Sequence, residues 1–184
     1  MKRFMGFRWL MIMLLLGGCA SQQVTMAETP TSPQQAVIVS NDFEDQKTGD
    51  WMARGDGTRI AISDAAAHSG KYSLYVSNRS ANWHGTQIDL LKKLQPGKKY
   101  GFSVWVYHTS ASPKKLIITM ERIYNGEKGW DRIGEVMVAP NTWVELKGEY
   151  QVKPVKVEEL VFYVEAENSS LSYYVDDVTI SQVK

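Results

Sequence analysis

The chain has 184 residues, of which 43% are hydrophobic and 11% aromatic, and this is enough for one globular domain with its own core. Its formal net charge is +1, but three of the basic residues lie within the first 18 residues, and the remainder holds 18 basic residues against 20 acidic ones. Such a balance gives no basic surface for a phosphate backbone, so nucleic-acid binding is not expected.

The N-terminus has the features of an export signal. Basic residues precede an apolar run at 10–16, and small residues follow it. This pattern predicts a cleaved signal peptide over residues 1–18, since the apolar run is too short for an ordinary membrane span. The segment Leu16-Gly17-Gly18-Cys19 resembles a bacterial lipobox, which implies that Cys19 is lipidated and becomes the first mature residue. Cys19 is the only cysteine of the chain. We therefore expect a lipid anchor in a cell membrane, with an ordinary secretory peptide as the alternative.

Residues 19–36 are rich in Ser, Thr, Gln and Pro and hold few large apolar side chains. Such a segment buries too little surface to order itself, so it is expected to be a flexible tether. The folded domain is then expected over residues 37–184.

Short apolar or alternating runs follow one another through this domain, separated by turn residues. No helical period is sustained over three turns, and a single turn of helix is expected only at 64–67. The pattern predicts an all-β, antiparallel β-sandwich. The predicted strands lie at 37–39, 58–62, 72–76, 87–90, 100–107, 116–120, 135–138, 142–146, 159–165 and 173–180.

Alternation along a strand indicates which side chains share a face. In the run 160–165, Leu160, Phe162 and Val164 suit a core, which places Tyr163 and Glu165 together on the opposite face.

The run 100–107 has the same character. Its even-numbered residues suit a core, whereas Trp105 and Tyr107 face away from it. Two large aromatic side chains on a non-core face need cover from loops, another layer or a ligand.

The turn-rich stretch 51–85 gathers polar and aromatic side chains that suit a sugar. Pyranose rings have apolar C–H faces and a rim of hydroxyl groups, so a sugar site needs aromatic platforms and planar hydrogen-bonding groups. Arg54, Asn82 and Trp83 supply these groups, and we expect the stretch to form half of a sugar-binding groove. The alternative for Trp83 is an ordinary, partly buried tryptophan.

An ordered set of motifs over about residues 41–180 resembles carbohydrate-binding module family 22. The set comprises Trp51-x-x-Arg54-Gly55-Asp56, Ala67-His68-Ser69-Gly70-x-Tyr72-Ser73-Leu74, Asn78-Arg79-x-x-Asn82-Trp83-x-Gly85, Leu94-x-Pro96-Gly97-x-x-Tyr100, Trp143, and Tyr174-Val175-Asp176-Asp177-Val178. The resemblance implies a galactose-binding-like jelly-roll. It also implies a groove on one sheet that binds xylan, or mixed-linkage β-glucan in some members, without catalysis.

The resemblance also implies the groove residues. They are Arg54, Trp83, Tyr163 and Glu165. Asn82 is a further candidate on chemical grounds, because its side chain can hydrogen-bond to sugar hydroxyls. A groove tyrosine of the family falls at Trp130, and Tyr124 is the competing position. Arg54 has an alternative role, as a structural ion pair with Asp56 or Glu165.

A structural calcium ion near the ends of the domain is implied in the same way. Glu44 and Asp177 would supply carboxylate oxygens, and carbonyls of residues 68–71 would complete the coordination shell. Asp176 is the alternative to Asp177. Both carboxylates could instead be solvated groups at strand ends.

Taken together, the sequence predicts a monomeric, surface-anchored lipoprotein that binds β-linked plant polysaccharide, with xylan and xylo-oligosaccharides expected first. Mixed-linkage β-glucan, an envelope glycan, or a structural role without a sugar ligand are the alternatives. A hydrolase is disfavoured. Glu121, Glu127 and Glu165 are carboxylates of a kind that any acidic domain has, and the sequence does not give the separation that a catalytic pair needs. The histidines belong to no metal or nucleophile motif.

Overall fold

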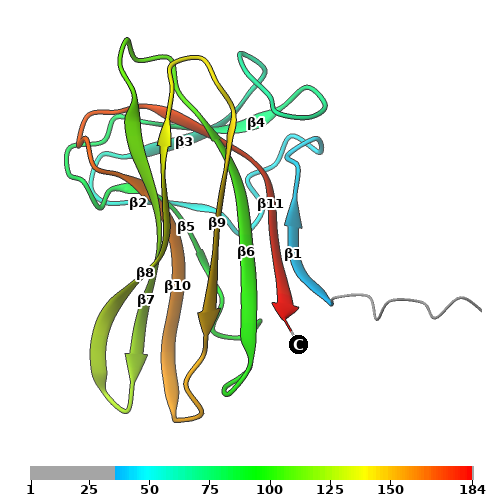
Figure 1. Cartoon of the computed structure of the whole chain (residues 1–184), viewed down its shortest axis with the longest axis vertical. Coiled ribbons are helices and arrows are strands. Elements are labelled where there is room, and N and C mark those ends of the chain that lie inside the picture. The colour runs from blue at the N-terminus through cyan, green and yellow to red at the C-terminus, as the bar shows by residue number, and fades with distance from the viewer. Residues whose placement is uncertain (1–35, 184) are drawn as a thin grey trace, which may run out of the picture. The chain divides into compact units, whose positions relative to one another are not determined.

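Two antiparallel sheets pack face to face in the computed structural model, which describes residues 36–183 (Figure 1). The predicted signal peptide, Cys19 and nearly all of the predicted tether lie outside these described residues. The strands are β1 (Val37–Asn41), β2 (Met52–Arg54), β3 (Arg59–Ser63), β4 (Ser73–Ser77), β5 (Gly85–Asp89), β6 (Lys99–Tyr107), β7 (Lys114–Tyr124), β8 (Glu127–Val138), β9 (Val144–Gln151), β10 (Val157–Ala166) and β11 (Tyr173–Val183).

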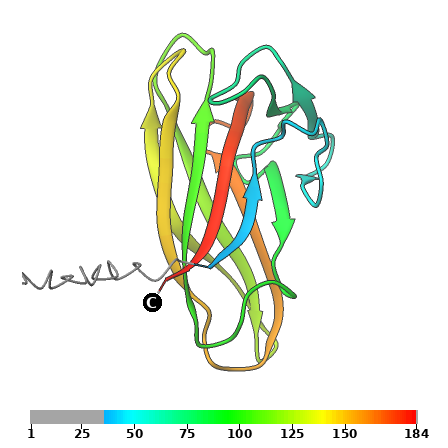
Figure 2. The same cartoon turned by 90° about the vertical axis from the view of Figure 1, so that its right-hand side faces the viewer.

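The sheet order brings distant parts of the chain together. One sheet has the order β3-β4-β11-β6-β9, with β1 also paired to β11, and the other has the order β2-β5-β10-β7-β8. Figure 2 shows the two layers turned by 90°. The predicted antiparallel β-sandwich of the jelly-roll class is confirmed. Strand β10 lies at the centre of the five-stranded sheet, between β5 and β7.

The core between the sheets follows the alternation of the strands. Leu160, Phe162 and Val164 of β10 are buried, and so are the even-numbered residues 100–106 of β6. The rings of Phe102 and Phe162 meet across the layers, with centroids 4.9 Å apart. The predicted core faces of both strands are confirmed.

The predicted secondary structure differs from the observed one in several places. The turn of helix predicted at 64–67 is wrong, and no helix of any kind occurs among residues 36–183, so none there could cross a membrane. The backbone groups of this segment are bonded elsewhere. The N–H of Ala65 donates to the Ser63 hydroxyl at 3.2 Å, and the Ala66 carbonyl accepts from Ser73 Oγ at 2.6 Å. Strand β2 was not predicted, since three residues are too few to show an alternation.

Loop and strand-end side chains cover the aromatic residues on the outer face of the six-stranded sheet. The His68 ring stacks on Trp105 with centroids 3.6 Å apart. The ring of Trp143, just before β9, stacks on Tyr107 at 5.2 Å. Trp105 and Tyr107, which the sequence placed on a non-core face, are therefore covered largely by side chains of the protein itself.

Candidate functional site

A hollow of about 460 Å³ lies on the outer face of the five-stranded sheet. Its lining comes from β2, the loop before β5, and strands β7, β8 and β10. The lining residues are Arg54, Trp83, Glu121, Trp130 and Tyr163. We call this hollow the groove, and it combines residues from both halves of the domain.

Tyr163 forms the floor of the groove. Its side chain is only 3% exposed, yet it faces away from the hydrophobic core. The Arg54 guanidinium carbon lies 3.9 Å from the centroid of the Tyr163 ring and 5.6 Å from that of Trp83. Burial raises the pKa of Tyr163 to about 12. The floor therefore presents a neutral phenol beneath a fixed cation.

Three hydrogen bonds hold the guanidinium of Arg54. It donates to the carbonyl of Trp83 at 3.2 Å, to Gln87 Oε1 at 2.9 Å and to Glu121 Oε2 at 2.5 Å. The ion-pair partner is thus Glu121, where the sequence offered Asp56 or Glu165. Arg54 keeps further donors for a ligand, since a guanidinium has more than three N–H groups.

Two tryptophans stand above this floor. Trp83 is 51% exposed and Trp130 is 56% exposed, which is high for so large an apolar side chain. Trp130 lies on β8, opposite Glu121 in the strand register. Tyr124 is 5% exposed, and its hydroxyl meets that of Tyr150 at 2.7 Å. The structure therefore places Trp130 in the groove and Tyr124 in the core.

The loop that carries Trp83 is fixed from below by Arg79. This side chain is 5% exposed and donates to six backbone carbonyls, including those of Asn82 at 2.8 Å and His84 at 2.7 Å. Burial lowers its pKa. Gly85 follows the loop, where a Cβ atom would lie 1.9 Å from the Val164 carbonyl oxygen. Only glycine lets β5 approach β10 so closely.

Two predicted residues lie near the groove without lining it. Asn82 is exposed beside Trp83, and its carbonyl rather than its amide makes the contact with Arg79. Glu165 is half-buried two residues beyond Tyr163 and accepts the Thr119 hydroxyl at 2.7 Å. Burial raises the pKa of Glu165, although the Thr119 hydrogen bond and the charge of Arg54 oppose the shift.

Glu121 is the groove residue that sequence reasoning did not assign to binding. Its side chain is 9% exposed and is bonded to both Arg54 and Lys128. Burial by itself would raise the pKa of Glu121, but the hydrogen bonds from Lys128 and Arg54 outweigh burial and lower it. Extending the alternation of the strand at 116–120 by one residue would have placed Glu121 on the face of Thr119.

Residues 35–171 match the family CBM_4_9, described as "Carbohydrate binding domain". The chain belongs to this family. Structurally similar domains include the CBM22-1 xylan-binding domain of Paenibacillus barcinonensis Xyn10C, at 27% identity and a TM-score of 0.77, covering 84% of this chain and 99% of that one. The C-terminal family 22 module of Clostridium thermocellum Xyn10B is 28% identical, with a TM-score of 0.74 over 80% of this chain and 93% of that one.

Among curated proteins, endo-1,4-beta-xylanase A of Thermotoga neapolitana is 41% identical over 155 residues. The match covers 83% of this chain but only 15% of the xylanase. The expected resemblance to family 22 modules is confirmed, and the similarity concerns one module within a much longer enzyme.

The predicted calcium ligands of the module, Glu44 and Asp177, both contact the loop before β4. Glu44 Oε1 accepts the backbone N–H groups of Lys71 at 2.8 Å and Tyr72 at 2.7 Å. Asp177 Oδ1 accepts the Ser69 hydroxyl at 2.8 Å. Carboxylates from both ends of the domain thus hydrogen-bond to the loop before β4.

A calcium ion at this loop would need backbone carbonyls as ligands besides the two carboxylates. Within residues 36–183 no three His, Cys, Asp or Glu side chains gather closely enough to hold a metal. Carboxylates together with carbonyls are ligands that calcium accepts. Asp176 is fully buried and accepts the N–H of His68 at 2.8 Å, whereas Asp177 is half-exposed. Both oxygens of Asp177 also have partners in the protein, since Oδ2 lies 2.5 Å from His68 Nδ1 and Oδ1 accepts the Ser69 hydroxyl.

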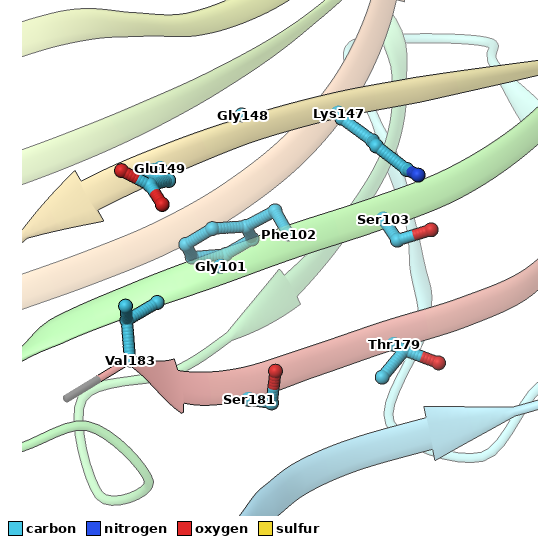
Figure 3. A pocket seen from close by; sticks show the side chains of 9 residues that line it. All are labelled: Gly101, Phe102, Ser103, Lys147, Gly148, Glu149, Thr179, Ser181 and Val183. Carbon is cyan, nitrogen blue, oxygen red and sulfur yellow. The ribbon is translucent and has the colours of Figure 1, made fainter. Parts of the chain in front are cut away.

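A second hollow of about 400 Å³ lies over β6, β9 and β11 of the other sheet (Figure 3). Small residues such as Gly101 and Ser181 line it, with Lys147 and Glu149 on β9. Its one aromatic residue, Phe102, is 2% exposed. Without an exposed aromatic platform, this hollow suits a sugar less well than the groove does.

Proposed function

We propose that this module binds xylan and xylo-oligosaccharides in the groove without changing them chemically. The observation that carries the proposal is the pair of exposed tryptophans, Trp83 and Trp130, above a tyrosine floor covered by Arg54. Support comes from the two similar structures, one described as a xylan-binding domain, and from the relative that is a xylanase.

Each groove residue has a definite task in this proposal. Trp83 and Trp130 contact the apolar C–H faces of successive sugar rings. Arg54 donates its remaining N–H groups to ring hydroxyls, and Tyr163 supports the guanidinium from below. Glu165 lies farther along β10 and accepts hydroxyl groups at the end of the groove. Affinity should be modest, since an open groove buries little area and sugar hydroxyls must give up water.

The charges in the groove support binding rather than hydrolysis. A glycosidase needs two carboxyl groups that flank the scissile bond. Among the lining residues the only carboxyl group is that of Glu121, and two cations hold it ionised. This arrangement suits a static ion pair better than a proton donor.

The test is affinity electrophoresis in gels that contain xylan, mixed-linkage β-glucan, cellulose derivatives or bacterial envelope glycan. We expect xylan to retard the wild-type module most. Trp83→Ala should abolish the retardation, whereas Met137→Ala, which removes a side chain that is 55% exposed elsewhere on the same sheet, should not. Retention of Trp83→Ala equal to that of the wild type would contradict the groove assignment.

We also propose that lipidation of Cys19 holds the module at a membrane surface, where it would keep polymer near secreted hydrolases or a transporter. The lipobox-like segment before Cys19 supports this, and acyl chains add roughly 0.8 kcal/mol of membrane affinity per buried CH₂. Expression of the full chain should place it in the membrane fraction, and Cys19→Ser should release it. Unchanged fractionation of Cys19→Ser would contradict the anchor.

A further inference from the structure

Glu121 lies between the two walls of the groove. In the strand register it is opposite Trp130 on β8 and opposite Val161 on β10. Its side chain is 9% exposed, and each of its oxygens has a different cationic partner. Oε2 accepts from Arg54 at 2.5 Å, and Oε1 contacts the ammonium of Lys128.

These two cations reach opposite sides of the groove. The Arg54 guanidinium covers the floor and bonds to the carbonyl of Trp83 on one side. The Lys128 ammonium lies 5.6 Å from the centroid of the Trp130 ring on the other side. A chain of contacts therefore runs from Trp83 through Arg54, Glu121 and Lys128 to Trp130.

We infer that Glu121 is a positioning residue that fixes both walls of the groove before a ligand arrives. The inference rests on the proposed function of the groove. Each oxygen of Glu121 already has a cation of the protein as its partner, and the remaining N–H groups of Arg54 are left for ligand hydroxyls. Groups that are already held in their bound geometry lose less conformational freedom on binding, which strengthens affinity.

Glu121→Gln tests this role with little change in shape. A glutamine has one acceptor oxygen and an NH₂ group, so it can serve one cation and must turn a donor toward the other. We expect the dissociation constant for xylohexaose to rise about tenfold or more, as for loss of a charge-assisted hydrogen bond. Glu135→Gln is the matched control, since Glu135 pairs with Arg132 on β8 outside the groove lining.

A second measurement needs no ligand. The Nε–H group of Arg54 gives its own ¹H–¹⁵N signal, which the variant Arg54→Lys identifies by its loss. In the wild type this proton should exchange slowly with solvent, and in Glu121→Gln we expect exchange to be at least about tenfold faster. Glu135→Gln should leave the rate unchanged. This readout decides the positioning role even if xylohexaose proves not to bind, in which case the proposed function alone fails.

A double-variant comparison separates positioning from a general structural effect. If Glu121 acts through Arg54, Glu121→Gln should weaken binding much less when Arg54 is already alanine. Lys128→Met provides a variant at a side chain that is 46% exposed, where loss of folding is not expected. It should leave the Arg54 exchange rate unchanged and raise the dissociation constant about two- to fivefold, since Trp130 loses its cation.

Two results would overturn the inference. One is wild-type exchange of the Arg54 Nε–H in Glu121→Gln, whatever happens to affinity. The other is an affinity loss in Glu121→Gln that is equally large with and without Arg54.

Discussion

Replacement of Trp130 by alanine should weaken xylan binding with little effect on folding. A tryptophan side chain has at most about 250 Å² of accessible surface. At 56% exposure, about 140 Å² is available to a ligand. A sugar ring that covers one face of the indole would remove about 70 Å² of this from water, which is about 1.8 kcal/mol at roughly 25 cal/mol per Å². The dissociation constant should therefore rise about 20-fold.

Isothermal titration of Trp130→Ala and wild type with xylohexaose measures this change directly. Chemical unfolding should show a difference of no more than about 0.5 kcal/mol, since the side chain is largely exposed. Met137→Ala on the same strand is the control, with 55% exposure and no place in the groove. Wild-type affinity in Trp130→Ala would refute the assignment of the second aromatic platform.

Three further predictions concern stability. Arg79→Met should lower the free energy of unfolding by about 3 kcal/mol or more, because the backbone carbonyls that now accept from Arg79 would lose their donor. A urea midpoint equal to that of the wild type would contradict this prediction. The raised pKa of Glu165 means that the folded state favours its protonated form, so its contribution should fall as pH rises from the ordinary carboxyl pKa through the raised value. Glu165→Gln should remove that slope and be more stable than wild type at pH 7, and an identical pH profile for both proteins would count against the buried carboxyl. If calcium binds, EDTA should lower the melting temperature of the wild type by about 5 °C or more. The melting temperature of Asp177→Asn should not change with EDTA. Equal melting temperatures of the wild type with and without EDTA would exclude the ion.

Alternation within strands was enough to predict much of the fold and part of the site. It separated the core residues of β10 from Tyr163 and Glu165, and the structure has both faces as expected. This works because the direction of a side chain in a strand depends on local backbone geometry alone.

The sequence alone could not decide between Trp130 and Tyr124 as the second aromatic platform, because the decision depends on how β8 pairs with β7. The start of β8 is charged and glycine-rich, so it shows no apolar alternation, and only its pairing with β7 reveals it as a strand. That pairing sets the register which turns Trp130 outward.

The ion-pair partner of Arg54 could not be predicted from the sequence either. Strands β2 and β7 are separated by β5 and β10 in the sheet, and their residues 54 and 121 lie far apart in the chain. Contact between Arg54 and Glu121 depends on the sheet order and on Tyr163 supporting the guanidinium between them. Sequence patterns contain neither.

Titration of the wild-type module with xylohexaose and cellohexaose, in parallel calorimetric experiments, tests the central claim most directly. The two ligands have equal numbers of β-1,4-linked sugar rings but differ in the hydroxymethyl group that glucose adds. The proposed groove predicts binding of xylohexaose with a measurable dissociation constant and weaker binding of cellohexaose. No heat with xylohexaose at ligand concentrations where cellohexaose saturates the module would contradict it.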